Sequence, residues 1–477
     1  MTRAVVVGSG PNGLAAATVL ARAGATVTVY EAAEELGGGA RSGESLVPGL
    51  IQDHCSAVHT MAPRSAFFES LDLQRMGVCW GYAPIDCAHP LDGGDAALLR
   101  TSITETAWGL GADGRRWSAA FGPSARAYDR LSGEIMKPML GIPRHPLLIA
   151  RFGLVAGPPP ALVQHLFRSE KARALFMGVA AHAFSRLDLP LVTGIGAGII
   201  TAGHANGWPV VIGGTGRFTD AHVASLERMG VRFETGRRVD ALRDLPAHDL
   251  AILDVHPRAA VGIVGDRLPQ RTRRAYERFG SGSSAYKVDF AVEGGVPWAN
   301  PGVRQAGTVH LGGAAAEIVR AERQVSRGRM PERPFVLVGQ QYLADPERVA
   351  DGGIVPVYAY AHVPHGYTGD ATEAVIAQIE RFAPGFRDRI VACSSASPAD
   401  FEARNENFIG GDILTGAKSP AQFLLGPRGI TPFPYDTGAP GVYLCSAATP
   451  PGPGIHGMGG YNAAQRALRF AGRTAAA

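Results

Sequence analysis

Hydrophobic and polar positions at the start of the chain follow the pattern of a strand, a glycine-rich turn, a helix and a second strand. The run Ala4–Val7 is apolar throughout, which is typical of a strand buried on both faces. The helical stretch Leu14–Ala23 is followed by Gly24, a favoured residue just past a helix end, and Thr26–Tyr30 is rich in β-branched residues. We therefore expect a βαβ unit over residues 3–31.

Further along the chain, the pattern predicts a long helix, a second helix–strand block, a β-rich region and a C-terminal strand, loop and helix. The predicted helices are Ala161 to about Phe184, Phe218–Arg228, Thr372–Phe382 and Tyr461–Ala471. The predicted strands are Val231–Glu234, Leu250–Asp254, Tyr286–Val292, Gly307–Leu311, Pro334–Tyr342, Val355–Ala361 and Gly441–Cys445. We expect the strands between residues 285 and 365 to be mostly antiparallel.

Length and composition indicate a globular protein of two joined domains. The chain has 477 residues, and a single hydrophobic core rarely grows beyond roughly 250–300 residues. Hydrophobic residues make up 46% of the sequence, so a large core is available. The net charge of +4 is spread among interspersed acidic and basic residues, which gives little support for nucleic-acid binding.

The cysteines and the N-terminus indicate the compartment. The five cysteines form no C-x-x-C pair, which favours a reducing compartment and disfavours a disulfide reductase or a zinc site. The first strand leaves no room for a signal peptide, and no apolar run approaches the roughly 20 residues of a membrane span. We expect a cytoplasmic protein, with peripheral membrane association left open and no indication of the oligomeric state.

The turn after the first strand carries a dinucleotide fingerprint. The sequence Gly8-Ser9-Gly10-Pro11-Asn12-Gly13 opens the first helix. Gly8 allows the tight turn, Gly10 lets the backbone approach a pyrophosphate, and Gly13 permits close packing of helix on strand. Glu31 ends the second strand, where a carboxylate can accept hydrogen bonds from an adenosine ribose. A surface glutamate after an ordinary glycine turn is the alternative interpretation.

A second glycine cluster favours FAD over NAD as the cofactor. The sequence Leu36-Gly37-Gly38-Gly39-Ala40-Arg41 follows the acidic residue closely. It brings another backbone segment to the pyrophosphate, and Arg41 can neutralise the charge there. An NAD-binding half has no use for such a segment.

Several stretches resemble those of the phytoene-dehydrogenase-related flavoproteins, a branch of the superfamily that also holds amine oxidases and Rab escort proteins. The chain is most similar to the bacterial and mitochondrial group labelled pyridine-nucleotide-disulphide-oxidoreductase-domain proteins. The stretches, besides the fingerprint, are Val210–Gly216, Tyr286–Asp289, Ala306–Gly313, His362–Gly366, Asn405-x-Asn407-x-x-Gly410-Gly411-Asp412 and Cys445–Ala464.

This resemblance implies an α/β protein with a discontinuous Rossmann-type FAD-binding domain and an α+β substrate domain that has a mostly antiparallel sheet. The FAD-binding domain would comprise residues 1–75, 195–260 and 430–477, and the substrate-binding domain residues 76–194 and 261–429. By the resemblance, Val239 lies on a strand whose backbone meets the adenine. Met458 and Gly459 lie where a helix N-terminus meets the flavin pyrimidine ring, whose negative charge on reduction the helix stabilises.

The cofactor-binding residues expected from the motifs and the resemblance are Gly8, Gly10, Pro11, Asn12, Gly13, Glu31, Ala32, Gly38, Gly39, Ala40, Arg41, Val239, Ser446, Met458 and Gly459. Ser446 stands, with Ala447, where many relatives outside the branch have an acidic residue toward the ribitol. The segment Gly194–Gly198 has the composition of a second dinucleotide loop but no acidic partner. We interpret it as a flexible loop, so NAD(P)H is not expected to be an efficient reductant.

His456 and Lys287 are the candidate catalytic residues. FAD accepts a hydride at N5, and such reactions often need a base or polarising group beside the substrate. His456 stands in the C-terminal loop expected at the flavin, although it could instead hydrogen-bond the loop backbone. Lys287 stands in a predicted strand, where it could hold a water near N5, pair with Asp289 or face solvent. No cluster of His, Cys and Asp has metal-ligand spacing.

Three functions follow. The first is an FAD-dependent oxidoreductase that desaturates, saturates or isomerises a C–C bond in a lipophilic polyene, isoprenoid or acyl-like chain. A flavin amine oxidase is the alternative within the enzymes, and a non-catalytic escort protein is the alternative outside them. Residues 135–167 are apolar with interspersed basic residues. We interpret them as core helices that roof an apolar tunnel to the flavin, with a membrane-interface segment as the alternative.

Overall fold

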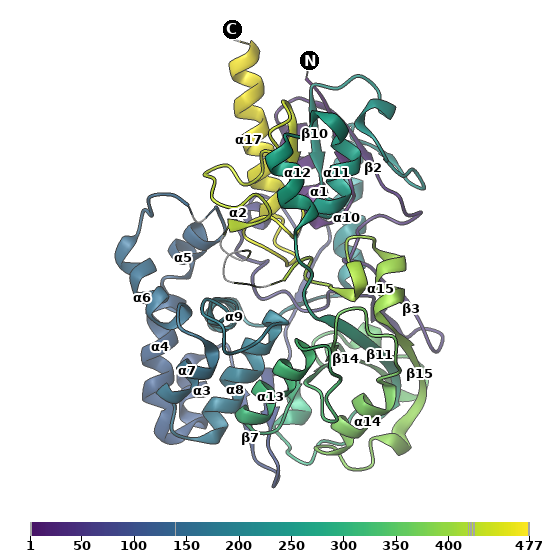
Figure 1. Cartoon of the computed structure of the whole chain (residues 1–477). Helices are drawn as coiled ribbons and strands as arrows, with labels where there is room; N and C mark the ends of the chain where they lie inside the picture. Colours follow the sequence, from purple (N-terminus) through teal and green to yellow (C-terminus); the bar gives the residue numbers. More distant parts are fainter. Residues whose placement is uncertain (1, 139, 418, 420–421, 423–424, 476–477) are drawn as a thin grey trace.

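Two β-sheets organise the molecule in the computed structural model, which describes residues 2–138, 140–417, 419, 422 and 425–475. A five-stranded sheet lies in the upper half of the view in Figure 1, close to both chain ends. A seven-stranded sheet lies in the lower half, with helices of residues 103–206 beside it on the left.

The five-stranded sheet is parallel throughout and is assembled from three separate parts of the chain. Its strands run in the order β16-β10-β1-β2-β9. Their bounds are β1 (Arg3–Val7), β2 (Thr26–Tyr30), β9 (Arg232–Glu234), β10 (Leu250–Leu253) and β16 (Val442–Leu444).

Helices cover both faces of this sheet, which is why its strands read as continuous apolar runs. On one face pack α1 (Pro11–Arg22), α10 (Thr215–Arg228) and α17 (Met458–Ala475), and on the other α11 (Pro257–Val264) and α12 (Gln270–Glu277). Alternate residues of β1 serve the two layers: Val6 belongs to the first core cluster, and Val5 and Val7 to the second.

The seven-stranded sheet runs in the order β15-β11-β14-β13-β12-β6-β7 and is antiparallel except where β12 pairs with β6. The predicted fold class, a Rossmann-type domain joined to a mostly antiparallel sheet, is therefore confirmed. The strands are β6 (Ile85–Pro90), β7 (Ala96–Leu99), β11 (Ser284–Glu293), β12 (Ala306–Leu311), β13 (Val336–Gly339), β14 (Ile354–Val363) and β15 (Ile390–Ala396).

The two faces of this sheet have different partners. Helix α14 (Thr372–Glu380) packs on one face, where Val357 and Ala359 of β14 are buried. The other face, which carries Tyr358 and Tyr360, meets α8 (Glu170–Ala180) and α9 (Thr193–Asn206) in a separate core cluster. Because successive side chains of a strand point to opposite faces, β14 buries one set of residues against α14 and directs the other set toward a cavity.

Shorter elements complete the fold. The remaining helices are α2 (Ala66–Glu69), α3 (Ile103–Gly109), α4 (Gly114–Arg126), α5 (Tyr128–Ile135), α6 (Pro146–Ala156), α7 (Pro160–Val163), α13 (Ala315–Val325) and α15 (Pro398–Arg404). The remaining strands are β3 (Ser42–Glu44), β4 (Ile51–Asp53), β5 (Trp80–Gly81) and β8 (Val210–Val211).

The single long helix predicted from Ala161 to about Phe184 is broken in the structure. The chain forms α7, a 3-10 turn and then α8, which begins after Ser169. The buried carboxylate of Asp113 accepts hydrogen bonds from the backbone N–H groups of Arg168 and Ser169. The Ser169 hydroxyl caps α8 by accepting from the N–H of Ala172. These contacts stabilise an extended link that the helical pattern alone could not reveal.

The flexible loop predicted for Gly194–Gly198 is wrong, because these residues lie within α9. Gly196 faces α8 so closely that a Cβ at this position would lie 2.8 Å from the Cα of Ala180. Gly203 is likewise covered by the indole of Trp208. The glycines therefore allow close packing of buried helices, and the cost in helix propensity is offset by these contacts.

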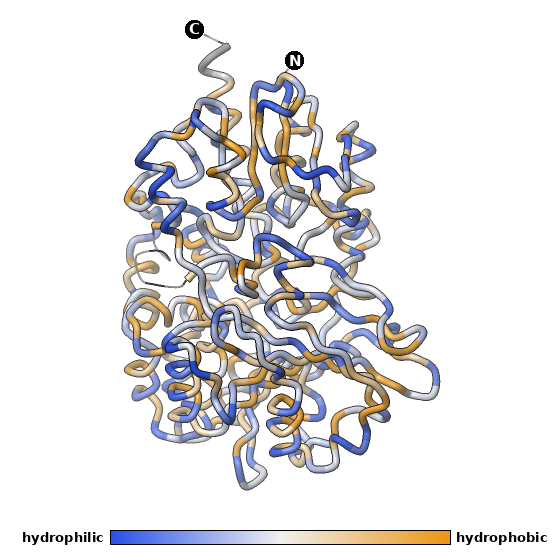
Figure 2. Tube along the Cα trace, turned by 45° about the vertical axis from the view of Figure 1, so that its right-hand side comes forward, coloured by the Kyte–Doolittle hydropathy of each residue, from blue (hydrophilic) through white to orange (hydrophobic). Residues whose placement is uncertain are grey.

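The segment predicted as core helices, residues 135–167, lies mostly at the surface. In α6 only Ala156 is buried, and Ile142 and Leu147 are 95% and 86% exposed. No single described helix is long and apolar enough to span a membrane. Helix α6 and the residues Pro160–Leu166 reach that length and hydropathy only together, and they are bent by 85°. Hydrophobic and hydrophilic residues are interspersed along the trace in Figure 2.

Candidate functional site

A cavity of about 900 Å³ joins the two sheets. Its volume is at the upper end of the roughly 300–1,000 Å³ that ligand sites in proteins occupy. One end is lined from the carboxyl ends of four parallel strands, by Gly8 after β1, Glu31 after β2, Asp254 after β10 and Ser446 after β16. Ligands of open parallel sheets bind at this edge.

The two glycine clusters meet at this end of the cavity. Gly8 has a φ of +96°, and a Cβ at Gly10 would lie 2.6 Å from Oδ2 of Asp254. A Cβ at Gly38 would lie 3.1 Å from the Cα of Gly10, so the second cluster packs directly on the first. These contacts fix the glycine turn beside the start of α1, where the helix dipole favours an anion.

Glu31 lines the cavity and holds the glycine turn at the same time. Its Oε2 accepts from the N–H and the hydroxyl of Ser9, at 2.9 and 2.6 Å, and its Oε1 accepts from the N–H of Ala33. The Ser9 hydroxyl also accepts from the N–H of Gly37 at 3.1 Å. The acidic residue and both glycine clusters therefore form one hydrogen-bonded unit.

Most of the predicted cofactor-binding residues line this cavity. They are Gly8, Gly10, Pro11, Asn12, Glu31, Ala32, Gly38, Gly39, Arg41, Val239 and Ser446.

Gly13, Ala40, Met458 and Gly459 lie one layer behind the lining residues. The N–H of Gly13 donates to Asp254 at 2.8 Å, and a Cβ at Gly459 would lie 2.9 Å from Oδ1 of Asn12. The same Asn12 oxygen accepts from the N–H of Gly460. Gly13, Met458 and Gly459 contribute this close packing at the starts of α1 and α17. Ala40 is fully buried, and its carbonyl accepts from the hydroxyl of Thr219.

Val239 lies in a segment without strand hydrogen bonds, beyond the end of β9, so the strand expected for it is absent from this described part of the chain. It is nonetheless 8% exposed and lines the cavity beside Arg237 and Arg238. Arg41 also lines the cavity; its Nε donates to the carbonyl of Gly38 at 2.9 Å, and its guanidinium reaches the carbonyl of Arg404.

Asp254 is a site residue that sequence reasoning missed. It is 6% exposed, lies at the end of β10 and lines the cavity at the fingerprint. Burial raises its pKa to about 7, the N–H of Gly13 lowers it and the charge of Glu31 raises it. The carboxyl therefore titrates near neutral pH at the place where the pattern predicts a pyrophosphate. Its position right after an apolar strand was the available indication.

The asparagine motif, for which the sequence offers no role, forms part of the cavity wall. Asn407 ties this wall to the parallel sheet: its Oδ1 accepts from the N–H of His256 at 2.6 Å and its amide donates to the carbonyl of Asp254. The segment around it contributes Arg404, Asn405, Phe408 and Leu414 to the lining. Asp412 accepts from the N–H groups of Gly282 and Gly416 and so stabilises the turn.

The far end of the cavity is formed by one face of the seven-stranded sheet. Cross-strand pairing places Tyr358, Gly339 and Thr308 in one row and Tyr360, Leu337 and His310 in the next. Of these residues all but His310 line the cavity, together with Cys55–Val58, His182, Trp208 and Gln341. The described lining residues of this sheet face carry no charged side chain, although the Lys287–Asp289 pair lies against the ring of Tyr358. Cys55 and Ser56 connect this face to the glycine clusters, because the N–H of Ser56 donates to the carbonyl of Gly39.

Two tyrosines from β14 are the largest aromatic contribution of the sheet to this end. The rings of Tyr358 and Tyr360 have centroids 5.9 Å apart and are nearly perpendicular, at 88°. The Tyr358 hydroxyl donates to the carbonyl of Cys55 at 2.5 Å. Sequence reasoning missed this pair, although the alternation along Val355–Ala361 puts both residues on one face.

A pair of neutral histidines stands beside the tyrosines. Nε2 of His182, which lines the cavity, lies 2.8 Å from Nε2 of His310. Nδ1 of His310 lies 3.4 Å from Sγ of Cys87. Burial lowers the pKa of His182 to about 3 and the pKa of His310 well below its usual value. At neutral pH both rings are uncharged, and one of the two facing nitrogens donates to the other.

Lys287 does not line the cavity. Its ammonium pairs with Asp289 and lies 4.6 Å from the ring centroid of Tyr358, and the residue is 1% exposed. Of the alternatives for Lys287, the structure shows the pairing with Asp289 and excludes a solvent-facing side chain. Its influence on the cavity would pass through Tyr358.

His456 also stands back from the cavity lining. Its Nδ1 accepts from the N–H of Met458 at 3.1 Å, and its carbonyl accepts from the hydroxyl of Ser65. Burial lowers its pKa to about 4. The ring is thus engaged with the loop backbone at the start of α17, which agrees with the alternative interpretation of His456. We expected residues 135–167 to form the entrance of an apolar tunnel beside His456. This entrance is wrong, because no described residue of this segment lines the cavity.

Comparisons with known proteins agree with this fold. Residues 6–71 match the family of NAD(P)-binding Rossmann-like domains. Over 98% of its length, the chain is 22% identical to the Rattus norvegicus pyridine nucleotide-disulfide oxidoreductase domain-containing protein 2, of which it covers 93%.

Solved oxidoreductases share the whole fold. A triple mutant of putrescine oxidase superposes with a TM-score of 0.62 at 16% identity, with 99% of each chain covered. A putative protoporphyrinogen oxidase from Exiguobacterium superposes with a TM-score of 0.58 at 14% identity, again over 99% of each chain. These likenesses show that the chain shares the fold of these proteins, and membership of the phytoene-dehydrogenase branch stays a prediction.

Proposed function

We propose that the protein is an FAD-dependent oxidoreductase that acts on an uncharged, mostly apolar substrate. The observation that carries the proposal is one continuous cavity, lined by the glycine motifs and Glu31 in one part and by Tyr358, Tyr360 and other uncharged residues of the seven-stranded sheet in another. FAD, when bound, supplies hydride acceptance at N5.

The residues present fit FAD. Gly10 and Gly38 both line the cavity, and neither tolerates a side chain, because a Cβ would collide with Asp254 or with the other glycine cluster. The hydroxyl of Ser446, a residue 2% exposed, lines the cavity and has no hydrogen-bond partner in the described structure. Since buried polar groups in proteins are generally paired, such an atom supports a polar ligand at this point. Glu31 would hold the ribose and Arg41 would neutralise the pyrophosphate.

The chemistry of the far end supports the substrate class. A charged substrate would lose its hydration there without gaining a counter-ion, which costs several kcal/mol or more in order of magnitude. Leu337, Trp208 and the two tyrosines present apolar surface instead. The few polar groups, Thr308, Gln341 and His182, are neutral and can orient a hydroxyl or carbonyl.

The residues of this chain would bind and orient the substrate and shield it from water. The aromatic walls exclude water from the reacting carbon, and His182 can donate or accept a single hydrogen bond at its exposed nitrogen, according to its tautomer. Oxidation of a saturated C–C bond needs a proton to leave as the hydride is transferred. Because the pKa of His182 is low, we assign this histidine to orientation of the substrate, while the redox direction and the reaction among desaturation, saturation and isomerisation stay open.

Amine oxidation is the second candidate. The perpendicular tyrosine pair favours it, because two aromatic rings can confine a neutral amine beside a flavin, and one similar structure is a putrescine oxidase. A substrate with a permanent positive charge at the far end is disfavoured, since no described lining carboxylate stands there. A non-catalytic escort protein would need neither the dinucleotide site nor the chamber.

Anaerobic mixing of the FAD-loaded protein with matched substrates tests the proposal. We expect bleaching of the flavin absorbance by an uncharged polyene, isoprenoid or acyl-like compound and none by its trimethylammonium analogue. Faster bleaching by a primary amine than by every uncharged hydrocarbon would favour the second candidate. The enzyme proposal would be contradicted if no compound in either series bleached the oxidised flavin and no unsaturated compound were saturated or isomerised by the dithionite-reduced protein without oxygen.

A further inference from the structure

Exposed apolar side chains are concentrated in one segment of the chain. Twelve large hydrophobic residues are exposed among the described residues, and six of them lie within residues 140–166. The six are Leu140, Ile142, Leu147, Leu154, Leu162 and Leu166. Scattered single residues of this kind are ordinary on soluble proteins, but a contiguous group indicates an interaction surface.

Helix α6 presents two different faces. Phe152 and Val155 pack toward the core cluster that includes α9. Leu147 and Leu154, which are 86% and 78% exposed, lie two turns apart on the opposite face, with Arg151 exposed between them. The helix is anchored from one side, so its outer apolar face is held in place rather than free to turn inward.

The charge of this surface has one sign. Residues 135–169 contain Lys137, Arg144, Arg151 and Arg168 and no aspartate or glutamate. The nearest acidic residue before them, Glu134, is 5% exposed and is already paired with Lys137 and with the backbone N–H groups of Arg144 and His145. Arg144 and Arg151 remain exposed. The apolar face is therefore rimmed by cations that the surrounding segment does not neutralise.

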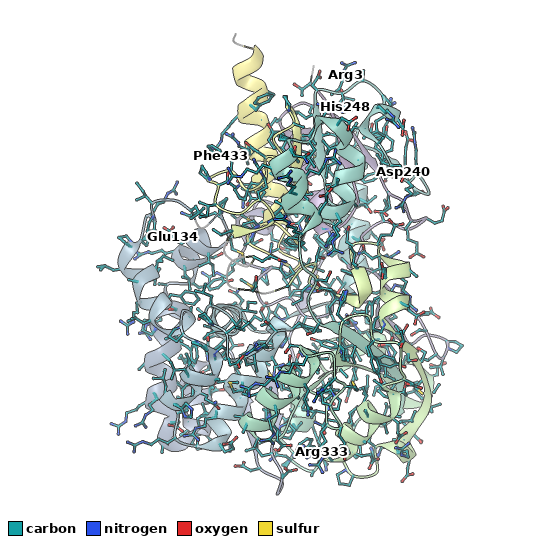
Figure 3. All side chains as sticks on the ribbon, viewed as in Figure 1. Arg3, Glu134, Asp240, His248, Arg333 and Phe433 are labelled. Atoms are coloured by element: carbon teal, nitrogen blue, oxygen red, sulfur yellow. The ribbon has the colours of Figure 1, made fainter. Side chains whose placement is uncertain are left out.

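The position in the fold leaves this surface accessible. Figure 1 shows α5 and α6 at the left edge of the molecule, and Glu134 is labelled at the same edge in Figure 3. The axis turns by 85° between α6 and the residues Pro160–Leu166. Ile142, in the link before α6, is 95% exposed. A convex surface formed by a helix, its preceding link and the following bend can enter a lipid headgroup layer without crossing it.

We propose that this surface, formed by residues 140–166, docks the protein onto a bilayer that contains anionic lipid. Ile142, Leu147 and Leu154 enter the boundary between headgroups and acyl chains, while Arg144 and Arg151 face the phosphates. Because Arg144 and Arg151 are exposed and residues 135–169 contain no carboxylate, the surface is positively charged and complements an anionic lipid layer. The inference does not depend on the identity of the cofactor or substrate.

Co-sedimentation of the full-length, FAD-loaded protein with vesicles tests this proposal. We expect binding to vesicles of phosphatidylcholine with phosphatidylglycerol to be at least about tenfold stronger than binding to phosphatidylcholine alone, and to weaken with salt. The triple variant Ile142→Ser, Leu147→Ser, Leu154→Ser should lose at least about another tenfold in affinity, since each fully buried side chain of this size contributes that order of magnitude. These side chains are exposed, so the variant should fold and retain its flavin.

A matched control removes three exposed apolar residues elsewhere, by Met229→Ser, Val391→Ser and Ile430→Ser. This control should bind vesicles as the unaltered protein does. The variant Arg144→Gln, Arg151→Gln should lose the preference for phosphatidylglycerol. The proposal would be overturned if the Ile142, Leu147 and Leu154 variant bound vesicles as tightly as the unaltered protein, or if the control lost as much affinity as that variant. It would also be overturned if the unaltered protein bound no vesicles. So would a dimer in sedimentation velocity that this triple variant dissociates while vesicle binding is unchanged.

Discussion

Individual polar residues at the dinucleotide end of the cavity serve both the protein's own hydrogen bonds and the expected cofactor. Glu31 holds Ser9 and Ala33, and Asp254 holds the N–H of Gly13. The sequence indicates Glu31, because its distance from the glycine motif is characteristic. For Asp254 the sequence shows only that it follows an apolar strand, and the fold is needed to show that β10 ends beside the turn after β1.

Replacement of Glu31 by alanine should weaken FAD binding. The ribose would lose a charge-assisted hydrogen-bond partner, and such bonds contribute about 1.5–3 kcal/mol each, or at least about tenfold in affinity. Ser9 and Ala33 also lose their acceptor, so we expect a lower melting temperature as well. Titration of the apoprotein with FAD, followed by flavin fluorescence, gives the dissociation constant. The FAD dissociation constant of Glu31→Gln should lie between those of the unaltered protein and Glu31→Ala. An unchanged dissociation constant in Glu31→Ala would show that Glu31 does not bind FAD.

Asp254 should make FAD binding depend on pH. With a pKa raised to about 7, the carboxyl is mostly protonated at pH 6 and mostly ionised at pH 8, where it repels an adjacent pyrophosphate. We expect FAD affinity to fall as pH rises above 7, by up to about tenfold per pH unit. Asp254→Asn keeps the shape and the acceptor for Gly13 without the charge, so its affinity should be flat between pH 6 and pH 8. A parallel decline in both proteins would contradict this assignment.

Asp254 has a related effect on stability. Its folded-state pKa of about 7 lies above the ordinary aspartate pKa of 3.8. The stabilising contribution of the protonated carboxyl is therefore fully present below about pH 4 and is lost as pH rises through about 7. In unfolding experiments on the apoprotein, the free energy of unfolding of Asp254→Asn should therefore rise relative to that of the unaltered protein as pH rises from about 4 to about 7.

His456 should act on the loop rather than on the reaction. Its Nδ1 accepts from the N–H of Met458 where α17 begins, a contact that asparagine can replace and alanine cannot. We expect His456→Ala to lower the melting temperature and FAD retention, and His456→Asn to restore both. If His456→Asn kept FAD and stability but lost flavin reduction by substrate, His456 would be a catalytic residue after all.

At the scale of elements, periodicity predicts the strands well and fails where tertiary contacts override local preference. The βαβ unit and the four middle strands were expected nearly in place, since burial on one or both faces leaves a clear pattern. Helix α9 was not expected, because its glycines look like a loop until Ala180 of α8 is seen against Gly196. The break before α8 depends on Asp113, which is distant in sequence.

Two glycines of α9 should respond in opposite ways to alanine. At Gly196 a Cβ would lie 2.8 Å from the Cα of Ala180, while at Gly198 nothing stands within 4 Å. Gly196→Ala should therefore destabilise the fold by about 1–3 kcal/mol through overpacking. Gly198→Ala should stabilise it by about 0.5–1 kcal/mol, since alanine favours the helix. Urea unfolding measures both, and stabilisation by Gly196→Ala would mean that the two helices do not pack this closely.

At the scale of the whole molecule, the site exists only where two sheets meet. The fingerprint, the C-terminal loop and the asparagine motif form one end, and a sheet built from residues 85–396 forms the other. Sequence motifs indicated the first end because backbone approach to a phosphate requires glycine at fixed spacing. The second end requires no particular residue type at a fixed spacing, so no sequence motif indicates it. Neutral residues such as Trp208, Leu337 and Tyr360 become a chamber only through strand order and register.

The central claim is that this cavity holds FAD as its cofactor, and native mass spectrometry of the purified full-length protein tests it most directly. The account predicts one FAD per chain, held without a covalent bond. Cys55 lies beside Gly39, but burial raises the pKa of its thiol to about 12 and so keeps it protonated and unreactive. Acid precipitation should release the yellow cofactor into the supernatant, and Glu31→Ala should purify with less of it. A protein that carries no flavin after purification and does not take up added FAD, or one that binds NAD in its place, would contradict the account.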